Sequence, residues 1–192
     1  MSWYDPGKPI LDPAKQIESK YPGMKVPVLP ARAVVFCLGK GMPLLKEHYP
    51  CHQLMEKLPG FITHSEVLGI DGIPGVCFLH GGYAAPQIAC TVETLHVLGV
   101  KETFLVGLCG GFAPHLSVGD IILPDKVWSE EGTSRHYLED PGFAQVTPPF
   151  PFNALASFFP SQFWAFNPMT DATKATKNII LFITPFFGLL YI

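Results

Sequence analysis

Hydrophobic and polar positions along the chain form two patterns, which predict strands and helices in turn. Runs of mostly apolar residues occur at 31–38, 76–79 and 103–108. Such a run is typical of a strand that is covered on both faces. Between the second and third runs, apolar residues recur every three or four positions, as on one face of a helix. These residues are Ala85, Ile88, Ala89, Val92 and Leu95. The pattern therefore predicts strand, helix and strand over residues 76–108.

A glycine turn follows each of the three apolar runs. These turns are Gly39-Lys40-Gly41, Gly81-Gly82 and Cys109-Gly110-Gly111. Two parallel strands joined by a helix require a right-handed crossover, so their turns meet at the carboxyl edge of one sheet. Open α/β sheets bind ligands at that edge. We therefore expect Gly39, Gly81 and Gly110 to lie near one edge.

The remaining segments predict a mixed sheet. Residues 65–70 and 76–79 flank a stretch suited to a chain reversal, so we expect them to pair antiparallel. Residues 43–58 predict an amphipathic helix that Pro50 interrupts. Residues 121–123 predict a short buried strand, and residues 127–137 predict either a loop or edge strand near a ligand or a solvated connection. The predicted fold class is α/β, a mixed twisted sheet with flanking helices.

Composition divides the chain into three parts. Residues 1–30 contain six prolines, which predict an extended arm, either a poorly ordered leader or a contact with another subunit. Residues 31–142 form the α/β domain. Residues 143–192 hold ten of the 15 phenylalanines and only three charges, so they predict an apolar tail of no clear assignment. The run at 179–192 is shorter than the about 20 residues of a spanning helix, and membrane contact through it is an alternative.

Charge and cysteine content exclude several classes of protein. The net charge is -3 and the two arginines, Arg32 and Arg135, lie far apart, so nothing resembles the basic stripe of a nucleic-acid binder. The five cysteines form no C-x-x-C pair, which is typical of free thiols in a reducing compartment. With no visible secretory signal, this predicts a cytoplasmic protein. His115 and His136 lack metal-ligand spacing, so we expect no metal.

One long motif carries a resemblance to a known family. It is VGLCGGFAPHLSVGDIILP at residues 106–124, supported by residues 38–41, residues 81–93 and EGTSRHY at 131–137. Together these segments resemble the N-terminal half of the nucleoside phosphorylase superfamily, of the uridine and purine nucleoside phosphorylase type with related nucleosidases. The resemblance implies a homo-oligomer that acts on the N-glycosidic bond of a purine or pyrimidine nucleoside, with phosphate or water as the acceptor.

The resemblance also suggests which residues bind the substrates. Such chemistry needs a cradle for the anion, a polar clamp on the sugar and a proton donor to the departing base. By resemblance, the phosphate and ribose side comprises Gly39, Lys40, Gly81, Cys109 and Gly110. Tyr137 matches the aromatic residue that stacks on the base. Phosphate is the co-substrate that this implies, and no other cofactor is expected.

Several positions depart from the family pattern. Phosphorolytic members carry an arginine in the first glycine loop and another on the strand before the second loop, where this chain has Lys40 to Pro43 and Leu105. Leu108 replaces a hydroxyl residue that usually contacts phosphate. A lysine is a point charge and does not reproduce the bidentate guanidinium fork. Hydrolysis is therefore an alternative to phosphorolysis.

The acid and the sugar clamp have no visible counterpart. The family takes a ribose-binding glutamate and a proton-donating aspartate from its second half, and residues 143–192 match neither. We therefore leave the catalytic residues unassigned and expect a truncated chain with poor turnover, or a non-catalytic nucleoside-binding module. Glu130 or Glu131 could substitute for the acid if its loop folds inward. His80 is either a ligand contact or a structural residue, and Cys109 suits packing better than nucleophilic attack.

Overall fold

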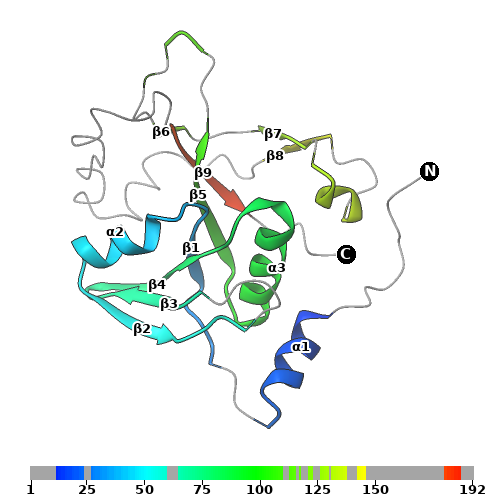
Figure 1. The fold of residues 1–192 in the computed structure, drawn as a ribbon. Helices are drawn as coiled ribbons and strands as arrows, with labels where there is room; N and C mark the ends of the chain where they lie inside the picture. Colours follow the sequence, from blue (N-terminus) through cyan, green and yellow to red (C-terminus); the bar gives the residue numbers. More distant parts are fainter. Residues whose placement is uncertain are drawn as a thin grey trace.

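A computed structural model describes residues 12–23, 27–59, 65–109, 113–115, 117, 121–122, 126–129, 131–137, 142–145 and 180–186 (Figure 1). The helices of these ranges are α1 (Pro13–Lys20), α2 (Gly41–His48), α3 (Ala84–Val97) and the 3₁₀ helix η1 (Thr133–His136). The strands are β1 (Arg32–Phe36), β2 (Cys51–Met55), β3 (Val67–Ile70), β4 (Ile73–His80), β5 (Glu102–Cys109), β6 (Ile121–Ile122), β7 (Lys126–Trp128), β8 (Phe143–Gln145) and β9 (Ile180–Phe186).

The main sheet is mixed, as the sequence predicts. Within the described residues its strand order is β2-β3-β4-β1-β5-β9-β6, and β7 pairs with β8 separately. β1 lies between β4 and β5 and runs parallel to both, with Phe36 opposite His80 on one side and Val106 on the other. β3 pairs antiparallel with β4, which confirms the predicted reversal. Helix α3 connects β4 to β5 across β1, so the three parallel strands end at one edge.

Each face of the parallel strands is covered by helices. On one face, Val34 and Phe36 pack in a buried cluster with Met42 and Leu45 of α2. On the other face, the alternate residues of β1 pack in a cluster that includes Ile17 of α1 and Leu95 of α3. Figure 1 shows α2 on one side of the sheet and α3, with α1 beside it, on the other. Because both faces are buried, the ends of these strands are the part of the sheet that a ligand can reach.

The helix predicted over residues 43–58 is wrong beyond His48. Tyr49 is extended, with φ −133° and ψ 139°, because the residue before a proline is disfavoured in the helical region. After Pro50 the chain becomes β2, whose Cys51 lies opposite Ile70 of β3. The interruption expected at Pro50 is therefore the end of the helix, and the segment beyond it is an edge strand.

The prediction of an extended N-terminal arm is wrong for residues 13–20, which form α1. Asp12 caps this helix, because its Oδ1 accepts a hydrogen bond of 2.9 Å from the N–H of Ala14. Pro13 occupies the first helical position, where no N–H is needed and the fixed φ of proline suits a helix. Ile17 is buried and anchors α1 in the core. Pro13 is one of the prolines that predict an extended arm, yet it begins this helix. Residues 1–11 lie outside the described ranges.

Part of the C-terminal tail belongs to the sheet. β9 pairs antiparallel with β5 over its whole length, from Thr103 opposite Phe186 to Cys109 opposite Ile180. β6 pairs with the other side of β9. Most of residues 143–192 lies outside the described ranges, so the boundary expected after residue 142 stays a prediction. In the part of the chain that is described, no helix combines the length and the apolar character needed to cross a membrane.

Candidate functional site at the carboxyl edge of the sheet

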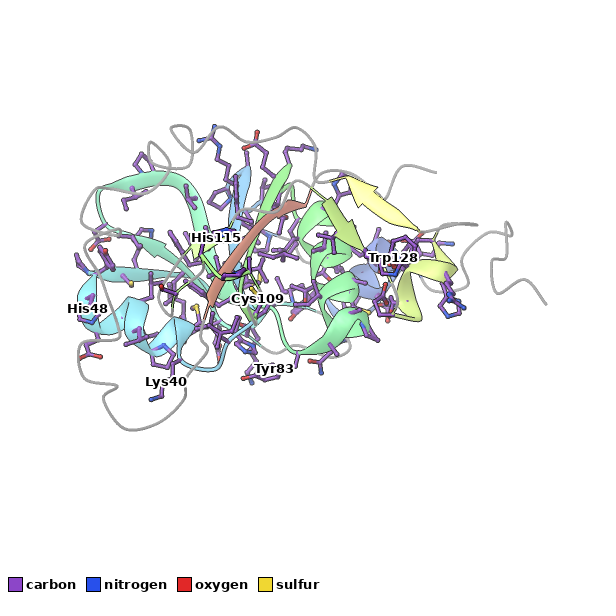
Figure 2. The ribbon with its side chains drawn as sticks, turned by 90° about the horizontal axis from the view of Figure 1, so that it is seen from above. Lys40, His48, Tyr83, Cys109, His115 and Trp128 are labelled. Carbon is purple, nitrogen blue, oxygen red and sulfur yellow. The ribbon has the colours of Figure 1, made fainter. Side chains whose placement is uncertain are left out.

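The carboxyl ends of β1, β4 and β5 bring together most of the predicted site residues. Gly39 follows β1, Gly81 follows β4 and Cys109 ends β5, and the parallel register places all three strand ends at one edge. Figure 2 labels one residue near each of these strand ends, which are Lys40 after β1, Tyr83 after β4 and Cys109 at the end of β5. Gly110 lies outside the described residues. The expectation of one shared edge is confirmed for Gly39 and Gly81.

The first glycine turn joins β1 to α2. Gly41 donates its N–H to the carbonyl of Leu38 at 3.2 Å, and α2 begins there. A Cβ on Gly41 would stand 2.5 Å from Cγ of Phe36, so the turn needs glycine for close packing. Lys40 is the exposed N-cap of α2, and its side chain makes no capping hydrogen bond. The turn therefore presents an ammonium group at the start of a helix, where positive charge and backbone dipoles both favour an anion.

The second glycine turn uses its backbone N–H groups internally. Gly81 donates to the carbonyl of Phe36 at 3.0 Å, and Gly82 donates to Nδ1 of His80 at 3.0 Å. The next N–H, of Tyr83, donates to Oε1 of Gln87 at 2.6 Å. These three donors are not available to an oxyanion. A phosphate or ribose role for Gly81 stays a prediction, and it does not rest on the N–H of Gly81.

Close packing explains why Gly81 is a glycine. A Cβ at this position would stand 2.2 Å from Cγ1 of Val35, whose side chain is fully buried. The carbonyl of Gly81 lies 2.9 Å from the hydroxyl of Thr91, a buried residue of α3. The turn is thus fixed between β1 and α3, and it sets the direction in which the following residues leave the sheet.

Tyr83 connects the two turns. Its hydroxyl lies 2.8 Å from the point where a Cβ on Gly39 would stand, and its ring contacts the ring of His80 edge-on at 5.0 Å. The Tyr83 side chain is 58% exposed, so it lies on the surface of the edge. The sequence singles out His80 but not Tyr83. Its place directly after Gly81-Gly82 is the signal that could have identified it.

The surroundings of the His80 side chain favour its neutral form. Partial burial lowers its pKa below the usual value, because a desolvated imidazolium is disfavoured. Its Nδ1 accepts a hydrogen bond from Gly82, which a protonated Nδ1 cannot do. The ring therefore brings a polar but uncharged group to the edge.

β5 brings apolar side chains to the same region. Leu105 packs against the core cluster on the α3 face, so it cannot act as an anion ligand. Leu108 is 54% exposed close to the end of the strand, and Cys109 is half-buried beside it. The described residues of β5 contain no arginine that could bind a phosphate.

Tyr137 lies against the side of α3. Its hydroxyl donates a hydrogen bond of 3.0 Å to Oε1 of Glu93. Desolvation, and then the charge of Glu93 and this hydrogen bond, raise the pKa of Tyr137 well above its usual value. Glu93 comes nine residues after Ala84, the first residue of α3, which corresponds to roughly 13 Å along the helix. Base binding by Tyr137 stays a prediction, and its hydroxyl is already engaged away from Tyr83.

Glu131 has the properties of a capping carboxylate. It accepts hydrogen bonds from the N–H groups of Thr133 at 2.6 Å and Ser134 at 3.0 Å. Burial alone would raise its pKa, but these hydrogen bonds and those of the Ser134 hydroxyl outweigh that effect and lower the pKa. An ionised carboxylate has no proton to donate, so the structure does not support Glu131 as the substitute acid. Glu130 lies outside the described ranges.

No metal centre is visible in the described ranges, because no three His, Cys, Asp or Glu side chains gather there to hold an ion. The five cysteines are free thiols. Burial raises the pKa of Cys37, next to the end of β1, to about 11, so this thiol is protonated and a poor nucleophile.

Comparison with known proteins assigns the family. A family model described as "Phosphorylase superfamily" matches residues 32–165. This chain belongs to the phosphorylase superfamily. The matched residues contain the three parallel strands and both glycine turns described above. The resemblance seen in the sequence is thereby confirmed.

Individual superfamily members match shorter stretches. Uridine phosphorylase from Escherichia coli (strain K12) is 31% identical over 97 residues, which cover 47% of this chain and 38% of that protein. Uridine phosphorylase from Haemophilus influenzae is 34% identical over 77 residues, covering 39% and 30%. Guanosine phosphorylase from Halorubrum lacusprofundi is 36% identical over 56 residues, covering 29% and 23%. The match spans less than half the length of each of these relatives.

Solved structures of the superfamily share the fold. Uridine phosphorylase from Vibrio fischeri superposes with a TM-score of 0.53 at 18% identity, covering 83% of this chain and 63% of the other. Purine nucleoside phosphorylase from Toxoplasma gondii, solved in complex with immucillin-H, gives a TM-score of 0.50 at 20% identity, covering 63% and 48%. These values confirm the predicted fold class, a mixed sheet with flanking helices of the nucleoside phosphorylase type.

Proposed function

We propose that this chain is a nucleoside phosphorylase-like protein that binds a purine or pyrimidine nucleoside at the carboxyl edge of β1, β4 and β5 and acts on its N-glycosidic bond. The observation that carries the proposal is the contact of Tyr83 with Gly39, which joins the turns after β1 and β4 into one surface. That surface holds an aromatic ring, a neutral imidazole and the ammonium group of Lys40. Relatives that match the chain bear the names of uridine and guanosine phosphorylases, which supports a nucleoside as the ligand.

The acceptor of the ribosyl group is the less constrained part of the proposal. Lys40 supplies a cation for phosphate, but Leu105 packs in the core and Leu108 is an exposed apolar side chain where the family has phosphate ligands. A single point charge holds a phosphate less firmly than a guanidinium fork does. We therefore favour an activity that depends little on phosphate, with water as the alternative acceptor.

Binding without turnover is the second candidate. Glu131 is an ionised cap, so it does not supply the proton that the departing base needs. General acid catalysis is typically worth about 10² to 10⁴ in rate. If no other group protonates the base, the edge binds a nucleoside and releases product slowly or not at all.

Two measurements on the full chain test the proposal. Calorimetric titration with uridine and with guanosine should show binding of at least one of them, and no binding of either contradicts the proposal. Release of free base from the bound nucleoside, followed with and without phosphate, then separates phosphorolysis, hydrolysis and binding alone. Base release that requires phosphate would restore phosphorolysis as the first choice.

The role of Lys40 is tested by substitution. Lys40→Ala should weaken phosphate binding if the first turn holds the anion. Lys101→Ala is the matched control, because Lys101 is an exposed lysine just before β5, at the opposite edge of the sheet. Equal phosphate affinity in both variants would remove Lys40 from the anion site.

The partners, oligomeric state and cellular location of the protein are also proposals. The superfamily supports a nucleoside and phosphate as small-molecule partners, and we propose, on the resemblance of the sequence alone, a homo-oligomer in the cytoplasm. We expect no cofactor other than phosphate. Light scattering of the purified chain and fractionation of cells that express it test these points.

A further inference from the structure

The imidazole of His80 is held in one tautomer. Its Nδ1 accepts a hydrogen bond of 3.0 Å from the N–H of Gly82, so Nδ1 carries no proton. A neutral imidazole has one N–H, which must therefore be on Nε2. The lowered pKa of His80 agrees with this neutral form. The fold thus specifies which nitrogen donates.

The position of the His80 ring is fixed as well as its tautomer. The backbone N–H of His80 donates to the hydroxyl of Ser65 at 2.9 Å, which holds the end of β4. The ring of Tyr83 meets the imidazole edge-on, with 67° between the two planes. Contacts on the Nδ1 side and on the ring therefore limit the directions in which Nε2–H can point.

The Nε2–H of His80 is the hydrogen-bond donor of the second glycine turn that has no partner among the described residues. The N–H groups of Gly81, Gly82 and Tyr83 all have partners within the protein. By contrast, no hydrogen bond in the described part of the chain involves Nε2 of His80. The backbone N–H of Gly82 is used by Nδ1 of His80, so the donor that this turn presents is the Nε2–H on the opposite side of the imidazole ring. The imidazole ring of His80 lies at the same sheet edge, where the exposed Tyr83 side chain approaches Gly39.

We propose that His80 binds the nucleoside directly, its Nε2–H donating a hydrogen bond to a neutral oxygen of the ligand, either a base carbonyl or a ribose hydroxyl. This inference rests on the proposed function, since it takes the carboxyl edge as the nucleoside site. A neutral donor suits a neutral oxygen, whereas the charged Lys40 on the neighbouring turn suits an anion. The two turns would then divide the ligands between them, the nucleoside at His80 and the anion at Lys40.

Two substitutions separate ligand binding from a structural role. In His80→Asn the amide oxygen lies where Nδ1 was, so it can still accept from Gly82, but the side chain is too short to replace Nε2. In His80→Gln the amide nitrogen reaches the place of Nε2, while the acceptor for Gly82 is lost. His96→Asn, an exposed residue in the last turn of α3, is the matched control.

We expect His80→Asn to weaken nucleoside affinity about 3- to 10-fold, the loss of one neutral hydrogen bond. His80→Gln should retain more affinity than His80→Asn even though it is the less stable variant, and His96→Asn should bind as the unchanged protein does. Titration with the free base alone distinguishes the two acceptors, because the loss in His80→Asn appears with the free base only if a base carbonyl is the partner. A structural role predicts the opposite order, with His80→Gln the weaker binder.

Nitrogen NMR of the imidazole gives a test that does not depend on a variant folding. In the free protein, His80 should show an unprotonated Nδ1 and a protonated Nε2, and addition of the nucleoside should shift the Nε2–H signal. A protonated Nδ1, an unmoved Nε2–H signal, or unchanged nucleoside affinity in His80→Asn would overturn the inference and leave the proposed function standing. Failure of the unchanged protein to bind any nucleoside overturns the proposed function, and the inference with it.

Discussion

The hydroxyl of Tyr83 occupies the space beside Gly39 that a β-carbon would fill, at 2.8 Å from its ideal position. Gly39 follows β1 and Tyr83 follows β4, so this contact depends on two strands whose register sets Phe36 opposite His80. The two glycines nearest the contact have different functions in the fold. Gly39 gives room to an exposed phenol, and Gly81 gives room to the buried side chain of Val35.

Gly39→Ala should change stability little. Its φ is not in the left-handed region, and the added Cβ meets only the far end of an exposed side chain, which can move. We expect the free energy of unfolding in urea to change by less than about 1 kcal/mol, in the range of ordinary surface substitutions. Because Tyr83 must leave its place, nucleoside affinity should change even so. A variant with unaltered nucleoside affinity would show that the contact is incidental to binding.

Gly81→Ala should be clearly destabilising. The new Cβ would stand 2.2 Å from Cγ1 of Val35, in a core that has no space for another carbon. Overpacking of this kind costs about 1 to 3 kcal/mol, and urea unfolding measures it. Combining Gly81→Ala with Val35→Ala should cost less than the sum of the two single changes, since each relieves the other's defect. Simple additivity would contradict the packing explanation.

Ala84→Gly should leave stability unchanged or raise it. Ala84 has φ +66°, a left-handed conformation in which a side chain costs roughly 1 to 2 kcal/mol and glycine does not. Ala85→Gly is the matched control, because its φ is ordinary and glycine there should cost about 0.5 to 1 kcal/mol. Thermal unfolding of the two variants compares them directly. Equal destabilisation would mean that the strain at Ala84 is absent in solution.

Tyr137→Phe tests whether Tyr137 attaches the 131–137 segment to α3. Loss of the hydrogen bond to Glu93 should lower the free energy of unfolding by about 0.5 to 1.5 kcal/mol. Because phenylalanine keeps the ring, stacking on a nucleobase would survive. Glu93→Gln retains an acceptor and should cost less than Tyr137→Phe. If Tyr137→Phe weakens nucleoside binding without changing stability, the hydroxyl contacts the ligand instead of α3.

The His80 imidazole should make stability depend on pH below its ordinary pKa of 6.5. Burial lowers the pKa in the folded state, so between the folded pKa and 6.5 the unfolded chain binds more protons than the folded chain does. The contribution to stability is therefore fully present above pH 6.5 and is lost as the pH falls towards the folded pKa. Comparison of urea unfolding for the unchanged protein and His80→Asn isolates this contribution from that of the other histidines. Identical pH profiles would contradict the lowered pKa.

The parallel core of this protein was predictable because its signals are local. Strands buried on both faces give runs of mostly apolar residues, which is why β1, β4 and β5 stand out, and α3 follows from its apolar spacing. β2 gives no such signal, because its central residues His52 and Gln53 are exposed on an edge strand. The preceding helix pattern extends into it, and Pro50 alone marks the change.

The candidate site was predictable only in outline, since its contacts join residues distant in sequence. The order of strands and turns placed Gly39 and Gly81 at one edge, but the approach of Tyr83 to Gly39 depends on three-dimensional register. Sequence alone likewise could not show that the N–H groups after β4 are already paired within the protein. The pairing of β9 with β5 is another long-range relationship that no local sequence pattern predicts.

The central place of β1 has a consequence for synthesis of the chain. Among the described strands β1 is the first to be made, yet its two neighbours are β4 and β5, and the ion pair between Arg32 and Glu102 joins residues 70 positions apart. At about 5 to 20 residues per second, roughly 4 to 14 s separate the emergence of these two residues from the ribosome. Throughout that interval β1 lacks at least one of its two neighbouring strands, so a nascent chain is a natural client for a chaperone that shields residues 32–36 until β5 has been made.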